Sequence, residues 1–405
     1  MEGKFDVVIV GGGLAGLSLA FGLSDSGHRV AVLEARRGVS LVKRGMSLSP
    51  NGLKVLDSIH LLHDIEMIGR KVTVVKFLKD SGELLVAYDY SLIEHKQNYL
   101  LTILTQELEL VLRKRAEDGG VRLYESASFD SFMRENGEVN GVRATIDGNS
   151  SNLEAKIVVG ADGAKSKVRE LAGIRVQTRG YSSSYLVTVA GGTVESSDDA
   201  RHYLAKGKML GNFPLPVGRY LFYYVPVGAF ESLKARGLES FKGELTALAS
   251  ELRGPLETIN SWQDLTYMVP QRLNADSWVG DHVALVGDAA HSIEPSLGQG
   301  GSLALSDVGA LLEALSTCFE TSDFSKNALK SYENSRRPHT EFMQDMAERT
   351  ARLMNTDNNL IARFRDRSLR KAQENRKSMI LALEMASGMT QNFSIEQKLR
   401  LAGLL

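Results

Sequence analysis

The first residues of the chain carry a glycine pattern that is typical of turns that bind a dinucleotide. Gly11, Gly13 and Gly16 occupy the three fixed positions of a G-x-G-x-x-G motif. The first glycine permits a tight turn, the second lets a pyrophosphate approach the backbone, and the third lets the following helix pack on the strand. Unpaired N–H groups at the start of that helix would face the phosphates.

Glu34 adds a carboxylate at the spacing that such a site requires. It lies 18 residues after Gly16, at the end of the short apolar run 29–33. A carboxylate there accepts hydrogen bonds from ribose hydroxyls and repels a 2′-phosphate, so the pattern favours FAD or NAD over NADP. An unrelated glycine-rich turn with an ordinary surface carboxylate is the alternative. The strand, helix and second strand around the motif disfavour it.

Two further motifs place an aspartate just after a short apolar strand. Asp162 lies in residues 159–169, and Asp288 lies in residues 287–291. Small neighbours allow close backbone approach, and a carboxylate can accept from a sugar or ribityl hydroxyl. Residues 298–302 precede a helix whose first N–H groups could face an electron-rich group. Each motif alone also fits an ordinary turn with a side-chain hydrogen bond.

In this order and spacing, the three motifs resemble those of the FAD-dependent monooxygenases typified by p-hydroxybenzoate hydroxylase, the class A flavoprotein hydroxylases. The resemblance runs from about residue 5 to about residue 340, includes residues 332–338, and is weakest across residues 177–272. It implies FAD as cofactor, NADH or NADPH as electron donor, and O2. A flavin C4a-hydroperoxide would then hydroxylate a small aromatic or heteroaromatic substrate.

The resemblance also implies which residues hold FAD. The glycine turn and Glu34 would hold the ADP half, Asp162 would serve FAD and NAD(P)H binding, and Asp288 would bind the ribityl chain. Thr105 stands where family members often carry Arg or Gln, and Ser302 where many carry Asn; both positions lie close to flavin in the family. The implied cofactor-binding residues are Gly11, Gly13, Leu14, Ala15, Gly16, Glu34, Ala35, Arg36, Arg44, Gly45, Thr105, Asp162, Asp288, Pro295, Gly298, Gly300, Gly301 and Ser302.

Aromatic and apolar residues of two expected strands are candidates for the substrate pocket. These strands cover residues 209–215 and 220–225, joined by a turn. Either face of the strands could border the pocket, and packing in the core is the commoner role of such side chains. The candidates are Phe213, Leu215, Tyr223 and Pro295. No catalytic acid–base pair can be identified, and His291 is expected to make a structural hydrogen bond rather than act as a base.

The order of the elements predicts an α/β fold. Strand–helix–strand patterns occur at the N-terminus, near residue 160 and near residue 285, and antiparallel patterns lie between them. We therefore expect a Rossmann-type, glutathione reductase-like FAD-binding domain with an inserted antiparallel-sheet substrate domain and C-terminal helices. The predicted divisions are 1–72, 98–176 and 273–340 for FAD binding, 73–97 and 177–272 for the substrate-binding sheet, and 341–405 for the C-terminal helical region.

The composition is that of a globular protein. The 405 residues are 43% hydrophobic and 24% charged, with a formal net charge of −1, which gives no sign of a nucleic-acid partner. A single cysteine, Cys318, excludes an internal disulfide and a Cys-rich metal site, and fits a reducing compartment. We expect a cytoplasmic monomer or homodimer without an integral membrane segment or a metal. The basic segment 363–377 is interpreted as a solvated helix face rather than a membrane or partner surface.

Several alternatives share part of this pattern. A FAD-dependent reductase or dehydrogenase of the same fold, a non-catalytic flavin-bound protein that binds a metabolite, and an NAD-dependent dehydrogenase all stay open. Flavin-dependent halogenases and geranylgeranyl reductase-like enzymes carry tryptophan-containing motifs, and Trp262 and Trp278 lie in neither motif. These two classes are therefore disfavoured.

Overall fold

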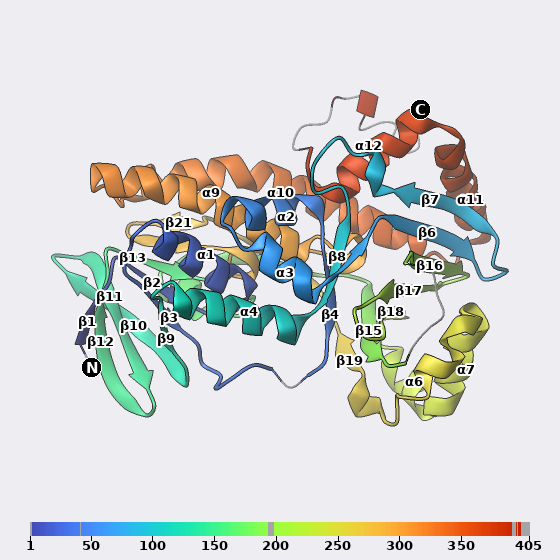
Figure 1. The fold of residues 1–405 in the computed structure, drawn as a ribbon, viewed down its shortest axis with the longest axis horizontal. Helices are drawn as coiled ribbons and strands as arrows, with labels where there is room; N and C mark the ends of the chain where they lie inside the picture. Colours follow the sequence, from blue (N-terminus) through green and yellow to red (C-terminus); the bar gives the residue numbers. More distant parts are fainter. Residues whose placement is uncertain (1, 41, 193–197, 391–393, 395, 398–405) are drawn as a thin grey trace.

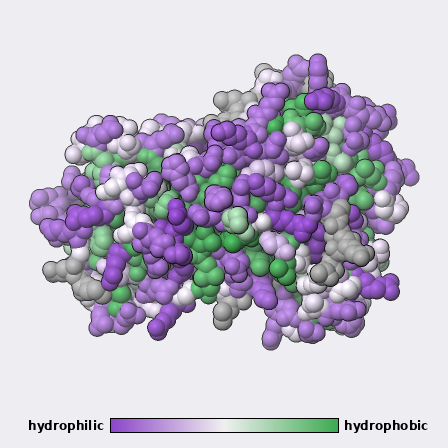
Figure 2. Space-filling view, in the orientation of Figure 1, coloured by the Kyte–Doolittle hydropathy of each residue, from purple (hydrophilic) through white to green (hydrophobic). Residues whose placement is uncertain are grey.

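The fold places a six-stranded sheet and its helices at one end of the molecule and a seven-stranded sheet with further helices at the other (Figure 1). The computed structural model describes residues 2–40, 42–192, 198–390, 394, 396 and 397. On the face shown in Figure 2, polar residues cover most of the surface, and apolar residues gather near the middle and around the C-terminal helices.

The six-stranded sheet brings together three remote parts of the chain. Its strands, in spatial order, are β21 (Val279–Gly280), β22 (Val283–Leu285), β13 (Ile157–Gly160), β2 (Val7–Val10), β3 (Val30–Leu33) and β9 (Arg122–Tyr124). All neighbours pair in parallel except β21 and β22. Short runs of valine, isoleucine and leucine suit strands that are buried on both faces. The strands expected near residues 5–10, 29–33, 157–159 and 283–286 are confirmed.

Helices cover this sheet and lead into the site. α1 packs against α4 and α9, and α9 also contacts α2 and α10. Their bounds are α1 (Leu14–Asp25), α2 (Pro50–Ser58), α3 (Leu62–Ile68), α4 (Thr105–Asp118), α5 (Lys167–Leu171), α9 (Gly300–Thr321) and α10 (Lys326–Met354). α9 is long and apolar enough to cross a membrane, but more than half of its apolar stretch is buried inside the protein, as in a core helix.

The seven-stranded sheet is assembled from two separated segments. Its order is β19 (Thr266–Met268), β15 (Ser183–Ala190), β18 (Arg219–Pro226), β17 (Lys208–Pro214), β16 (Ala200–Ala205), β6 (Val74–Lys79) and β7 (Leu84–Asp89). β6 and β7 form the expected hairpin, and β6 pairs in parallel with β16. The expected hairpin of β17 and β18 is also confirmed. On the face away from the C-terminal helices lie α6 (Phe230–Ala235), α7 (Leu238–Leu248) and α8 (Arg253–Leu256).

Three smaller sheets complete the architecture. They are β1-β12-β11-β10, β4-β8-β5 and β14-β20-β23. Their strands are β1 (Glu2–Lys4), β10 (Ala127–Glu135), β11 (Glu138–Ile146), β12 (Asn149–Glu154), β4 (Gly45–Leu48), β8 (Leu100–Leu104), β5 (Arg70–Val72), β14 (Val176–Gly180), β20 (Gln271–Ala275) and β23 (His291–Ser292). The sequence patterns did not predict β10, β11 or β12, whose turns are built on asparagine, aspartate and glycine.

The C-terminal helices α11 (Asn359–Glu374) and α12 (Arg376–Ser387) lie beside β7 at one end of the molecule (Figure 1). Within the basic segment, Arg365 is buried and donates to the Met354 carbonyl at 3.0 Å, whereas Arg370 pairs with Glu83 at 2.5 Å on the surface. Since each large sheet is built from separated segments, we keep the predicted domain boundaries as a proposal.

Asp307 of α9 joins three remote segments at one fully buried carboxylate. Its oxygens lie 2.6 Å from His291 Nε2 and 3.1 Å from Arg336 Nε, and it accepts from Gly287 N at 3.2 Å. Burial opposes ionisation, but His291 and Arg336 outweigh it and hold the pKa of Asp307 below its usual range. The structural role expected for His291 is confirmed, because its ring is held at this buried carboxylate.

Replacing Asp307 by alanine would leave Arg336 charged and unpaired in the interior. We expect Asp307→Ala to lower the free energy of unfolding at neutral pH by about 3–5 kcal/mol, the usual cost of breaking a buried pair. Because the folded-state pKa of Asp307 is lowered, its contribution is present at neutral pH and is lost as pH falls through that pKa. Urea denaturation of the native and variant proteins, repeated towards acid, measures both effects.

Asp118→Ala is the matched control, because Asp118 forms an exposed pair with Lys114 at 2.8 Å. Exposed pairs contribute little, so this variant should unfold almost like the native protein. An Asp307→Ala loss no larger than that of the control would contradict the role assigned to the buried carboxylate.

Candidate active site

The turn between β2 and α1 has the geometry that its glycines predict. Gly11 has a positive φ of 108°, and a Cβ there would lie 2.3 Å from the Ala161 carbonyl oxygen. A Cβ on Gly16 would lie 2.0 Å from the Gly11 carbonyl oxygen, so a larger residue would push α1 off the strand. A Cβ on Gly13, in contrast, would meet nothing within 4 Å. Gly13 therefore borders an open space at the uncapped start of α1, where a phosphate can reach backbone N–H groups.

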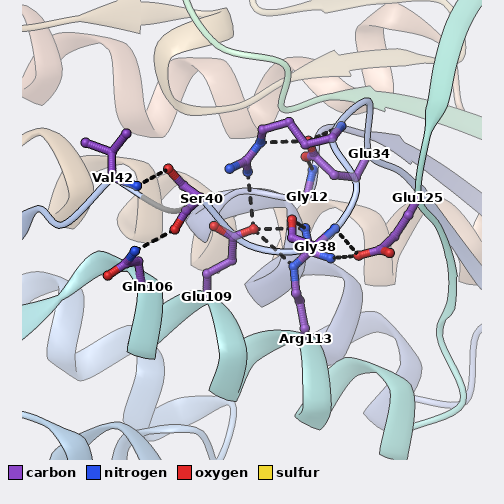
Figure 3. A network of polar contacts seen from close by, with 10 residues as sticks. Gly12, Glu34, Gly38, Ser40, Val42, Gln106, Glu109, Arg113 and Glu125 are labelled. Carbon is purple, nitrogen blue, oxygen red and sulfur yellow. Dashed lines mark hydrogen bonds and ion pairs between the residues drawn. The ribbon is translucent and has the colours of Figure 1, made fainter.

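Glu34 lies against this turn, in the network drawn in Figure 3. Gly12 N donates to Glu34 Oε2 at 2.9 Å, and Arg36 N donates to Oε1 at 2.9 Å. The Arg36 guanidinium joins Glu34 at 3.0 Å to Glu109 of α4 at 3.2 Å. The carboxylate is thereby fixed beside the turn. Two carboxylate oxygens offer about four acceptor sites, and three are used by Gly12 N, Arg36 N and Arg36 Nε, so about one further hydrogen bond can be accepted.

The loop after Glu34 is fastened to α4 by Arg113, which the sequence patterns did not single out. Arg113 is 6% exposed. It binds Glu109 at 2.8 Å and Glu125, and donates to the Gly38 carbonyl at 3.2 Å. Glu125 accepts from Gly38 N at 3.0 Å (Figure 3). A helical arginine is usually surface charge, so the burial that gives Arg113 this role could not be inferred from its position in the sequence.

The second motif turns inward at Asp162. Asp162 Oδ2 accepts from Lys167 N at 2.7 Å and from Val168 N at 3.1 Å, which caps the short helix α5. Arg169 links this motif to the third one, because it donates to the Ala289 carbonyl at 2.8 Å and to the Ala164 carbonyl at 2.9 Å. The part that Asp162 plays toward FAD or NAD(P)H stays a prediction.

The third motif places Asp288 at the main cavity of the protein. Its side chain is open to the cavity yet ringed by protein, and this burial raises the pKa of its carboxyl, with the nearby charge of His291 acting in the opposite direction. Gly287 before it has a positive φ of 58°. A Cβ on Gly287 would lie 3.1 Å from Ala304 of α9, so a larger residue would crowd the helix.

The start of α9 faces the same cavity. Gly298, Gly300 and Gly301 line it, and the helix begins at Gly300 without a side-chain cap. Its first N–H groups have no carbonyl partner within the helix. A Cβ on Gly301 would lie 3.2 Å from Leu14 of the glycine turn and 2.7 Å from Met46 of β4. The three motifs therefore converge on one place.

Ser302 and Thr105, two polar residues of the implied cofactor set, do not line this cavity. Ser302 is fully buried, and its hydroxyl accepts from Ser49 N at 2.8 Å, at the contact between α2 and α9. The Thr105 hydroxyl donates to the Arg44 carbonyl at 3.3 Å. The buried hydroxyl of Ser302 already accepts a hydrogen bond, so its backbone N–H is the group that could reach a ligand, and a role of Ser302 in FAD binding stays a prediction.

The main cavity has a volume of about 1590 Å³ and continues from the third motif between the seven-stranded sheet and helices α10, α11 and α12. Phe213 and Pro295, two of the pocket candidates, line it. Tyr223 lies on the opposite face of β18, where its hydroxyl donates to Glu244 and its ring packs on Phe241. Leu215 is buried beyond the end of β17 and does not line the cavity. Tyr223 and Leu215 are therefore removed from the candidate lining.

Polar aromatic residues that the sequence patterns did not select also line the cavity. They come from three strands of the seven-stranded sheet and from the turn after β7: Tyr88, Tyr90, His202 and Tyr220. Strand periodicity shows that alternate residues share a face. It does not show that β7, β16 and β18 face the same cavity, so these residues were not linked to one another.

Glu294 fastens the loop of Pro295 to the seven-stranded sheet. It is completely buried, and its carboxylate accepts from Ser296 N at 2.7 Å, from the Ser183 hydroxyl at 3.0 Å and from the Tyr185 hydroxyl. Burial raises the pKa of Glu294, although these hydrogen bonds act against the rise. The buried carboxyl group of Glu294 thus ties the loop that borders the cavity to strand β15, which carries Ser183 and Tyr185.

Comparisons with known proteins agree with this arrangement. The sequence model of a family described as "FAD binding domain" matches residues 4–347. The 6-methylpretetramide 4-monooxygenase of Streptomyces rimosus is 30% identical over 83% of this chain and 81% of that protein. A kynurenine 3-monooxygenase of Salinispora tropica is 29% identical over 84% of this chain and 78% of that protein. The crystal structure of P. aeruginosa PqsL with 2-aminobenzoylacetate has a TM-score of 0.79 and 27% identity, and the match covers 89% of this chain and 99% of that chain.

The open space at Gly13 predicts a variant that folds but binds its dinucleotide poorly. Gly13→Ala adds a methyl group where no protein atom lies within 4 Å, so the apoprotein should unfold at an unchanged temperature. The methyl group would obstruct the approach of a pyrophosphate to the backbone. We expect FAD bound per chain to fall at least tenfold, as measured by flavin absorbance after gel filtration.

Gly243→Ala in α7 is the control, since a Cβ there also meets nothing within 4 Å and lies far from the site. It should retain full FAD content. Equal FAD content in Gly13→Ala and Gly243→Ala would contradict the assignment of the glycine turn to the phosphates.

Removing the charge of Glu294 should affect stability differently from removing its hydrogen bonds. Glu294→Gln keeps polar partners for Ser183, Tyr185 and Ser296, and should be as stable as the native protein or more stable at neutral pH. Glu294→Ala leaves those groups unpaired and should cost about 1–3 kcal/mol. Because the folded-state pKa of Glu294 is raised, native stability falls as pH rises from the unfolded pKa through the folded pKa. The advantage of Glu294→Gln should therefore grow with pH in denaturation curves, and a constant difference would contradict it.

Proposed function

Because the chain belongs to the FAD-binding domain family, whose similar relatives are FAD-dependent monooxygenases, we propose that it uses FAD, NAD(P)H and O2 to hydroxylate a small aromatic or heteroaromatic substrate. The observation that carries the proposal is that parts of the second and third motifs line one cavity with an aromatic wall, and that the glycine turn packs against the start of α9 beside it. The chain is a FAD-dependent oxidoreductase of the monooxygenase type. Its particular substrate and electron donor belong to the proposal.

The residues present fit FAD in each part of the site. The open face at Gly13 and the uncapped start of α1 would take the pyrophosphate, and Glu34 would accept from the ribose hydroxyls. Asp288 would bind the ribityl chain. The free N–H groups at the start of α9 would face the electron-rich edge of the flavin ring.

When bound, FAD supplies the two-electron chemistry and the reaction with O2. The contribution of the chain is then to bind, orient and exclude water. Pro295 and the glycines before α9 border the cavity, and Phe213 and Phe222 give it an apolar aromatic wall. Such a wall keeps water from a reactive group and holds a flat ring in place, with its reacting atom about 3–3.5 Å from the oxygen it receives.

We also propose that the protein is a cytoplasmic monomer or homodimer. The single cysteine supports a reducing compartment, because Cys318 is buried and unpaired in α9. The near-neutral net charge of −1 is compatible with a small-molecule substrate rather than a polyanionic partner.

The purified protein, loaded with FAD, tests the proposal directly. NADH and NADPH oxidation should be measured with phenols, quinolones, pyridines and polyketide-like aromatic compounds. At least one compound should stimulate oxidation several-fold, and the product formed under ¹⁸O₂ should carry one labelled oxygen. Gly13→Ala should lose this activity together with its FAD.

The rival functions give different outcomes in the same assay. A reductase or dehydrogenase would transform a compound without incorporating labelled oxygen. A metabolite-binding flavoprotein would be yellow but would show no stimulated NAD(P)H oxidation. A protein that stays colourless after addition of FAD would contradict flavin binding itself.

A further inference from the structure

The main cavity is larger than a usual ligand pocket. Its volume of about 1590 Å³ exceeds the roughly 300–1,000 Å³ of a usual ligand pocket. It runs from Asp288 and Gly301 along the seven-stranded sheet to α11 and α12. Its length and the chemistry of its walls therefore carry information about the substrate.

The end near the third motif is marked by Tyr220 of β18. A Cβ on Gly45 of β4 would lie 2.5 Å from the Tyr220 ring, so the ring rests directly on this glycine. Ser47 of the same strand approaches Gly298, where a Cβ would lie 2.9 Å from its hydroxyl. Tyr220 therefore stands beside the loop and strand that border the flavin end of the cavity.

His202 of β16 lies farther along the same wall. Its ring stacks on Phe77 with centroids 4.6 Å apart, and Phe213 meets it edge-on at 5.3 Å. Gly211 on the neighbouring strand makes room for it, since a Cβ there would lie 3.5 Å from Nδ1. Aromatic contacts thus hold the His202 ring in place, and the lack of a side chain at Gly211 leaves space for it.

The two nitrogens of His202 have different surroundings. Nδ1 is enclosed and has no hydrogen-bond partner, which leaves Nε2 as the nitrogen that a bound molecule can reach. Burial lowers the pKa of His202 to about 4, so the ring is neutral at physiological pH. A buried N–H without an acceptor is rarer than a buried acceptor without a donor. The proton therefore belongs on Nε2, and His202 offers a hydrogen-bond donor to the cavity.

The tyrosine hydroxyls at this wall are donors too. Tyr88, Tyr90 and Tyr220 make no side-chain hydrogen bond within the part of the chain that the structure describes, although all three line the cavity. Burial raises the pKa of each phenol, to about 12 for Tyr88. The hydroxyls therefore stay protonated. None of these three hydroxyl oxygens is among the enclosed polar atoms that lack a partner, so they open into the cavity, where each can donate to an acceptor oxygen of a bound molecule.

Beyond these polar groups the buried part of the cavity wall is largely apolar. The apolar side chains come from β6, β8, α10, α11 and α12: Val75, Leu100, Met354, Leu369, Ala372 and Leu383. Arg367, Lys371 and Glu374 of α11 also line the cavity, but these three residues are exposed to solvent. Hydrocarbon is the chemistry that the buried apolar wall stabilises, at about 0.8 kcal/mol for each buried CH2 in general.

We propose that the substrate is a flat aromatic ketone that carries an extended apolar substituent, with its carbonyl oxygen accepting from His202 and Tyr220 and its substituent lying between the sheet and α11. This rests on the proposed function, since the flavin end of the cavity fixes where the ring lies. The hydrogen-bond donors of His202 and Tyr220 favour a substrate with an acceptor oxygen. The apolar part of the cavity favours a substrate with an apolar substituent. His202 and Tyr220 are thus specificity-determining residues.

Three probes separate the two parts of the proposal: 2-heptyl-4-quinolone, 2-methyl-4-quinolone and 2-heptylquinoline. They should be titrated into the FAD-loaded protein, with binding followed by the change in flavin absorbance and by calorimetry. The first has both the carbonyl and the long substituent, and should bind most tightly. Shortening the substituent should weaken binding on the order of a hundredfold or more, and removing the oxygen about tenfold.

Variants assign these differences to residues. His202→Phe and Tyr220→Phe keep the rings and remove the donors, so each should weaken 2-heptyl-4-quinolone about tenfold and leave 2-heptylquinoline unchanged. Tyr224→Phe, on the same face of β18 but outside this cavity, should change neither. Ala372→Phe should narrow the apolar end and reduce the advantage of heptyl over methyl.

The outcomes distinguish this inference from the proposed function. Equal affinity for the ketone and the deoxy probe, or equal losses of both in His202→Phe, would overturn the oxygen site. Equal affinity for the heptyl and methyl ketones would overturn the apolar substituent. In either case FAD content and stimulated NAD(P)H oxidation, measured in parallel, report independently on whether the protein is a flavin monooxygenase.

Discussion

The candidate site depends on the buried carboxylate of Asp307, a residue that is not itself expected to bind the cofactor or the substrate. Asp307 accepts from Gly287 N at 3.2 Å and lies 2.6 Å from His291 Nε2. Because these two residues are the two ends of the short loop that carries Asp288, Asp307 fixes both ends of that loop. Arg336 neutralises this charge from α10, and Tyr332 of the same helix donates to the Leu285 carbonyl at 2.8 Å, at the end of β22. Because an unpaired charge is costly in the interior, the positions of α9, α10 and the loop depend on one another.

Much of the cofactor half could be predicted because its determinants are local. The positive φ of Gly11 and the close contact at Gly16 are demands of the backbone itself, and glycine meets them in any surrounding sequence. The buried parallel strands could also be predicted from the sequence, because each is a short apolar run. The role of Arg113 could not be predicted from the sequence, because it depends on the burial of this side chain between α4 and the loop at Gly38. That burial exists only in the folded protein.

The substrate half could be predicted in outline but not in its orientation. Alternation places Tyr220 and Phe222 on one face of β18 and Tyr223 on the other. Which face is the cavity depends on what packs there. α7 covers Tyr223 through Phe241, while the C-terminal helices stand off from the opposite face and leave the cavity. The orientation of the Ser302 side chain could not be predicted for a similar reason: its hydroxyl accepts from the backbone of Ser49, which is far away in the sequence.

This contrast follows from how the two halves recognise their ligands. The dinucleotide would meet mainly backbone N–H groups and glycines, whose positions are fixed by turn geometry and by a parallel sheet. The substrate cavity is walled by side chains from β6, β7, β16, β18 and three helices, each from a different part of the chain. Changing one such side chain alters the wall without disturbing the backbone turn. The same architecture can therefore keep one cofactor while its substrate changes, and the identity of the substrate must be sought in residues such as His202 and Tyr220 rather than in the motifs.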